Sequence, residues 1–141
     1  MTTSIDHLIT TARGGRLGQR IEALGKLSQR VARDKALRDD ARVREILIEA
    51  LASDDASLYS FAAQGLRHIM HPAVTEALIT SLRTRKGHSV DGGLAIAEGL
   101  GRSADPRALA ALRDALAQPP KGMPKAPLRD AIAKLDRSLG A

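Results

Sequence analysis

The residues in this chain that come nearest to a metal site are two histidines. His68 and His71 lie three positions apart, a spacing that could present two imidazoles to one metal ion. Pro72 takes His71 out of the helix, however, and the sequence offers no third ligand beside the pair. We therefore expect no metal and no cofactor, and we interpret all four histidines as turn or surface residues.

Candidates for nucleophilic catalysis are also few. The chain contains no cysteine and no Gly-x-Ser-x-Gly sequence, and His88, Ser89 and Asp91 are too close along the chain to form a catalytic triad by themselves. The Gly-Leu-Gly sequence at 99–101 lacks the later glycine and the preceding strand of a dinucleotide-binding turn. We expect no catalytic residues and no enzyme. An active site assembled from distant acidic residues is the alternative that the sequence leaves open.

Basic residues near the N-terminus point instead to an anionic partner. Ten basic and four acidic residues lie between Arg13 and Arg44, a net charge of +6, whereas 45–82 carries −4. Such an excess attracts an acidic protein surface or the phosphate backbone of a nucleic acid, and a merely solubilising surface is the third possibility. The following residues should form a basic flank beside the apolar face of one helix over 16–33: Arg16, Arg20, Lys26, Arg30 and Arg33.

Two short motifs have weaker implications. The Gly-Arg-Leu-Gly sequence at 15–18 resembles the phosphate-clamping loop of an RNA-binding KH domain, but that fold needs strands that this sequence does not predict. Free amides at a helix start beside Arg13 and Arg16 could hold one phosphate or carboxylate, or the segment is a plain turn.

Pro124 and Pro127 match the PxxP pattern of ligands for small recognition domains. We interpret them as part of a connector over 118–127.

The elements that position all these residues are predicted to be helices. Apolar residues recur at helical spacing, helix formers dominate the long segments, and no segment alternates as a strand would. Small residues also recur on two helices, as Gly18, Gly25 and Ala32 and as Gly92, Ala95 and Gly99, which predicts close approach of neighbouring helices. The residues expected to cap or begin helices are Thr3 or Ser4, Asp39 or Asp40, the segment 53–55, His71 with Pro72, Ser89, and Asp105 with Pro106.

One helical hairpin is written twice between Phe61 and Leu116. Seven of the 20 positions from 63 to 82 are identical to the residues 34 positions later. A fixed period between 20 and 50 residues is the signature of stacked supersecondary units. The matched pairs are Ala63 and Ala97, Gly65 and Gly99, Leu66 and Leu100, Pro72 and Pro106, Ala77 and Ala111, Leu78 and Leu112, and Leu82 and Leu116.

The two copies resemble HEAT-like repeats of the short bacterial type, in which a helix ends near Leu-Gly, a turn carries Asp-Pro, and a second helix carries Leu-x-x-x-Leu. The second copy fits through 100–101 and 105–106, whereas the first has Arg67 in place of the turn glycine and His71 in place of the aspartate. The resemblance implies an all-α fold over a single domain, 1–141. We expect an α-solenoid, or superhelix, of about four hairpins and about eight helices.

The resemblance leaves function open among scaffolds, partner-binding proteins and occasional enzymes. We expect a non-catalytic protein-interaction module, a scaffold or adaptor that uses the concave face lined by the second helix of each hairpin. The alternative is a protein that binds the nucleic-acid backbone through the basic face of 13–44. The absence of cysteine, of a signal peptide and of a long apolar run favours a cytoplasmic protein without a membrane partner. The predicted partner-binding residues are Arg16, Arg20, Lys26, Arg30, Arg33, Tyr59, Arg67 and His68.

Overall fold

The structure is a computed structural model that describes residues 3–140, and within this range it contains helices and no strand. The all-α prediction is confirmed. The helices are α1 (Ile5–Gly14), α2 (Leu17–Arg33), α3 (Lys35–Arg38), α4 (Ala41–Leu51), α5 (Ala56–Leu66), α6 (Pro72–Thr84), α7 (Val90–Arg102), α8 (Pro106–Ala117) and α9 (Lys125–Gly140).

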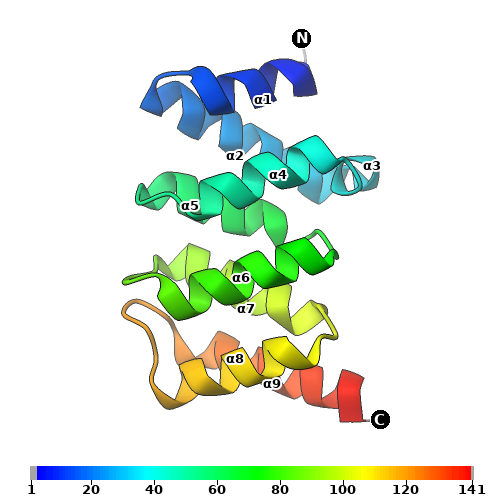
Figure 1. Cartoon of the computed structure of the whole chain (residues 1–141), viewed down its shortest axis with the longest axis vertical. Coiled ribbons are helices and arrows are strands. Elements are labelled where there is room, and N and C mark those ends of the chain that lie inside the picture. Colours follow the sequence, from blue (N-terminus) through cyan, green and yellow to red (C-terminus); the bar gives the residue numbers. More distant parts are fainter. Residues whose placement is uncertain (1–2, 141) are drawn as a thin grey trace.

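The helices form a stack of two layers, and the predicted hairpins are its rungs (Figure 1). Each hairpin pairs one helix of the first layer with one of the second: α1 with α2, α4 with α5, α6 with α7, and α8 with α9. The first layer is therefore α1, α4, α6 and α8, and the second layer is α2, α5, α7 and α9. Successive helices of the second layer pack against each other more extensively than those of the first layer. The layered order that the repeat predicts is confirmed.

The polar connection expected over 32–40 contains one helical turn, α3, that the sequence pattern did not indicate. The carboxylate of Asp34 caps this turn by accepting a hydrogen bond from the Ala36 amide at 3.0 Å. Arg38, in its last turn, donates to the carbonyls of Val31 and Ala32 at the end of α2. Because a single turn has no apolar periodicity, contacts with its neighbours rather than a sequence pattern hold it in place.

Side chains at the predicted helix starts do cap the helices. Ser4, Asp40, Asp55, Ser89 and Asp105 each accept a hydrogen bond from an amide in the first turn that follows.

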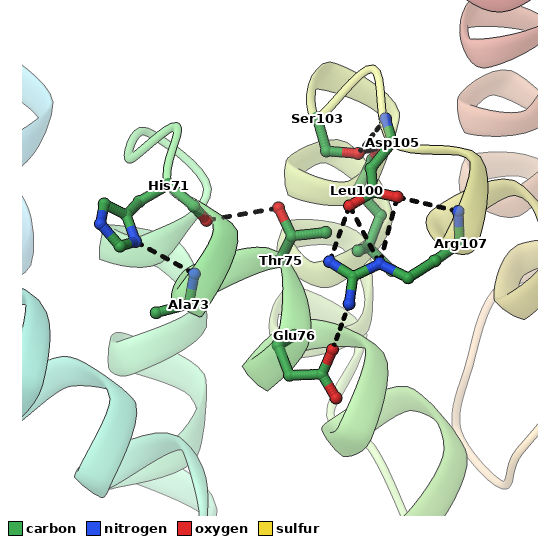
Figure 2. Close-up of polar contacts among 8 residues, drawn as sticks. All are labelled: His71, Ala73, Thr75, Glu76, Leu100, Ser103, Asp105 and Arg107. Atoms are coloured by element: carbon green, nitrogen blue, oxygen red, sulfur yellow. Dashed lines mark hydrogen bonds and ion pairs between the residues drawn. The ribbon is translucent and has the colours of Figure 1, made fainter.

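The two copies of the repeated sequence differ in chemistry at the start of the helix that follows the turn, which is α6 in the first copy and α8 in the second, as Figure 2 shows. In α8 the carboxylate of Asp105 accepts from the Arg107 amide at 2.9 Å, whereas in α6 Nδ1 of His71 accepts from the Ala73 amide at 3.0 Å. A histidine thus replaces the aspartate of the repeat without loss of the cap. In both copies the following proline lacks an amide hydrogen at a position where none is needed.

The core is built from aliphatic side chains and alanine, as the composition predicts. The recurring small residues on α7 allow neighbouring helices to pack closely. A Cβ atom at Gly92 would lie 2.3 Å from the Tyr59 ring, and one at Gly99 would lie 2.8 Å from Leu78. On α2, a Cβ atom at Gly25 would lie 3.5 Å from the Phe61 ring, an ordinary contact distance, so close packing does not depend on this glycine. A Cβ atom added at Gly18 would meet nothing within 4 Å and Ala32 is exposed, so the prediction is wrong for those two residues.

The proline-rich connector is shorter than expected. Helix α9 begins at Lys125, so Pro127 lies within its first turn and the PxxP pattern does not adopt an extended conformation. Met123 is buried, and Gly122 has φ of +83° where a side chain would collide with the His88 carbonyl. In the part of the chain that the structure describes, no helix is both long and apolar enough to cross a membrane.

Candidate functional site

The five basic residues of the predicted flank of α2 differ in the contacts that they make. Arg16 is the N-cap residue of α2, and its amide donates to the Gln19 side chain at 2.9 Å. Arg20 is half-buried, and its Nε donates to the carbonyl of Ala12 at the end of α1, at 3.1 Å. A cation there offsets the negative end of the α1 dipole. Arg20 therefore links α2 to the end of α1 within the first hairpin.

The remaining three basic residues of α2 make fewer contacts with other residues of the protein. Lys26 is paired with Glu22 one turn earlier at 3.0 Å, and both side chains are largely exposed. Exposed pairs of this kind contribute little stability. Arg33 is exposed and Arg30 half-buried, and neither forms an ion pair with another residue in 3–140. This part of α2 carries positive charge that the described residues leave uncompensated.

Tyr59 is not a contact residue, which corrects the sequence prediction. Its side chain is 0% exposed and lies between α5 and α7, where it packs against Gly92. Its hydroxyl is hydrogen-bonded to Nδ1 of His88, a residue that is also buried and not at the surface as expected. Burial raises the pKa of Tyr59 to about 12 and lowers the pKa of His88 to about 4. The phenol is therefore the donor and the neutral imidazole the acceptor.

Arg67 and His68 lie together at the end of α5, half-buried. Arg67 is paired with Glu98 of α7 at 3.0 Å, and Arg102 donates to the Arg67 carbonyl at 3.3 Å. Burial lowers the pKa of His68 below its ordinary value, and Arg67, Arg38 and Arg102 lower it further. Arg38 and Arg102 each reach carbonyls at a helix end, so these cations offset helix dipoles at the ends of α2 and α5.

Ion pairs link two of the three neighbouring pairs of helices in the first layer. Arg13 and Glu49 (3.3 Å), together with Arg42 and Asp6, join α1 to α4. Arg107 and Glu76 (2.8 Å, Figure 2), together with Arg83 and Asp114 (3.4 Å), join α6 to α8. No ion pair between α4 and α6 occurs among the described residues. The first layer is thus unlinked at its centre.

A groove of about 670 Å³ lies at this unlinked position, and we call it the α4–α6 groove. One wall comes from α4 and its end, and the other comes from α6. The walls are formed by Ile48, Leu51, Ala52, Ala77, Thr80 and Ser81. Asp54 and the segment 85–87 stand at one end of the groove. The sequence analysis did not identify this site, because its walls come from helices that are not neighbours in a hairpin.

Arg85 builds the closed end of the α4–α6 groove. Its guanidinium donates to the carbonyls of Ser53 (2.7 Å) and Gly87 (2.8 Å), and it lies over the ring of Tyr59, 3.7 Å from the ring centroid. Arg85 therefore connects the end of α4 to the loop between α6 and α7. Nothing in the local sequence pattern distinguished Arg85 from the other basic residues of the loop over 84–88.

The histidine pair is not arranged as a metal site. Nδ1 of His71 accepts a hydrogen bond from the Ala73 amide as a helix cap, and Nε2 of His68 lies within hydrogen-bond distance of Nε of Arg67. Within 3–140 no group of three His, Asp or Glu side chains is placed to hold a metal ion.

Comparison with known proteins agrees with this architecture. The family model described as HEAT repeats matches residues 44–133, which is more than half of the 141-residue chain and spans α4 to the middle of α9. The search of curated proteins and the search of solved structures gave no match. The stacked hairpins and this match together show that the chain belongs to the HEAT-repeat family.

Proposed function

We propose that the protein is a non-catalytic adaptor or scaffold that binds an acidic surface of another protein through α2. HEAT repeats generally serve protein interaction and scaffolding. Stacked repeats offer an extended concave surface that needs no catalytic residues. In this chain the second layer is the more tightly packed one, which is expected to place it on the inner side of the curve.

The observation that supports this proposal is the pair Arg30 and Arg33. Most other arginines of the chain pair with a carboxylate or reach a helix-terminal carbonyl, as Arg67, Arg102 and Arg107 do. Arg30 and Arg33 do neither within the described residues. A guanidinium that is not paired within its own protein is free to form bidentate contacts with a carboxylate of a partner.

Binding to a nucleic-acid backbone is the competing function, because the same two arginines suit phosphates. The surroundings favour a protein. Glu22, paired with Lys26, interrupts the positive charge that an extended phosphate backbone would need along α2, whereas a local carboxylate of a protein needs only those two arginines. Aromatic side chains are also not available for stacking on bases, because Tyr59 is buried and Phe61 packs against Gly25.

The experiment is affinity capture from the native cell extract with three forms of the protein. The Arg30→Glu/Arg33→Glu variant should lose a partner that the wild type retains. The control Lys121→Glu/Lys125→Glu changes the charge by the same amount at exposed residues far along the chain and should retain it. Equal recovery by all three forms would refute the role of α2. Binding of labelled duplex or single-stranded DNA that weakens steeply with salt and needs Arg30 and Arg33 would favour the competing function instead.

A further inference from the structure

The α4–α6 groove has the size and lining of a binding site for a few apolar side chains. Its volume of about 670 Å³ lies within the range of about 300–1,000 Å³ that is typical of ligand pockets. Ile48 and Ala77 are half-buried and supply apolar surface, and the exposed Thr80 and Thr84 also line the groove. The groove is therefore an apolar depression between α4 and α6 of the first layer.

The charge around the groove selects the kind of occupant. Arg85 and Lys86 stand at its closed end, and Asp54 is the acidic residue of the lining, so the lining carries a net charge of +1. Lys86 is exposed and forms no ion pair with any residue in 3–140. This positive end stands out because the segment 45–82, which forms most of the groove, carries −4. An acidic group beside the apolar part of a partner would complement it.

The backbone around the groove indicates that the occupant is helical. Both walls are helices, whose amides and carbonyls are paired internally, and no strand edge is present in 3–140 to receive an extended peptide. A helix brings its own backbone hydrogen bonds and needs only a groove for its apolar side chains. We propose that the α4–α6 groove docks an amphipathic helix of a partner protein, with acidic residues beside its apolar face. This site is separate from α2 and does not depend on the function proposed for α2.

The test uses a phage-displayed library of peptides of about 18 residues, which is five helical turns. Apolar residues are fixed at i, i+3, i+4 and i+7, and the flanking positions are random. Selection on the wild-type protein should enrich Asp and Glu at the flanks. An enriched peptide should bind Thr80→Trp about tenfold more weakly or worse, since the indole fills the groove from an exposed position. Lys86→Glu should also weaken it.

The controls separate this proposal from the role of α2. Ala110→Trp places the same indole on an exposed residue of α8 away from the groove, and it should bind the peptide as the wild type does. Arg30→Glu/Arg33→Glu should also bind it normally. Amide shifts of the labelled wild-type protein in NMR titrations should change in α4 and α6. No enrichment, enrichment of basic flanks, equal binding by Thr80→Trp, or shift changes confined to α2 and α5 would each overturn the proposal.

Discussion

The hydroxyl of Tyr59 is hydrogen-bonded to the imidazole of His88, 29 residues further along the chain, and both side chains are buried. The guanidinium of Arg85 lies over the Tyr59 ring. This contact joins α5 to the loop before α7, and Gly122 packs over the backbone of His88 from the loop before α9. His88 thus takes part in two connections between successive hairpins.

Acid should weaken the fold through His88. Its pKa is about 4 in the folded protein and 6.5 in the unfolded chain, so the unfolded chain binds more protons between these values. Stability is therefore complete above pH 6.5 and falls as the pH drops toward 4, by about 2 kcal/mol at pH 4.5. Urea unfolding at pH 7 and 4.5 should show this loss in the wild type and a smaller one in His88→Gln. A loss of equal size in both proteins would contradict the assignment.

Arg85 should stabilise the protein more than the lysine beside it. Arg85→Met removes two charge-assisted hydrogen bonds to carbonyls and the contact with the Tyr59 ring, and we expect a loss of about 2 kcal/mol. Arg85→Lys should restore only part of it, because an ammonium cannot reproduce the planar fork. Lys86→Met, at an exposed neighbour, should change the free energy of unfolding by less than about 0.5 kcal/mol. Thermal and urea unfolding measure all three.

Two glycines should respond to alanine in opposite directions. Gly92→Ala places a methyl group 2.3 Å from a carbon of the Tyr59 ring and should destabilise the protein by about 1–3 kcal/mol. Gly18→Ala meets nothing within 4 Å in a helix and should stabilise it by about 0.4–1 kcal/mol. The midpoint of urea unfolding should therefore be lower than that of the wild type for Gly92→Ala and higher for Gly18→Ala. Destabilisation of similar size by both would show that the close contact at Gly92 is not the cause.

The cap of α8 should depend on a side-chain acceptor. Asp105→Ala should cost about 1 kcal/mol, and Asp105→Asn should cost much less because the amide oxygen still accepts from the Arg107 amide. A hydrogen bond from the Arg107 side chain holds the pKa of Asp105 below its ordinary value of 3.8. This contribution is present above pH 3.8 and is lost as the pH falls further. Unfolding at pH 7 should rank wild type, Asn and Ala in that order.

The sequence by itself determined the longer helices, most of their starts and the repeat. A capping residue such as Asp105 contacts an amide only two residues away, and the apolar residues of a helix face repeat every three or four positions. Both features can therefore be predicted from a short stretch of sequence. The 34-residue period then predicts stacking, because each hairpin can bury its apolar face only against its neighbours. The substitution of His71 for aspartate shows the limit of reading a motif by residue type, since the imidazole performs the same capping.

Only the tertiary structure decided which polar residues are free to meet a partner. Arg20 and Arg30 look alike in sequence, but Arg20 contacts the end of α1, eight residues away and across a turn. Tyr59 is one of the predicted partner-binding residues, yet the absence of a side chain at Gly92 creates the space that buries it. The α4–α6 groove depends on how closely two helices pack that lie about 30 residues apart in sequence. A local sequence pattern does not predict whether such helices pack tightly or leave a groove between them.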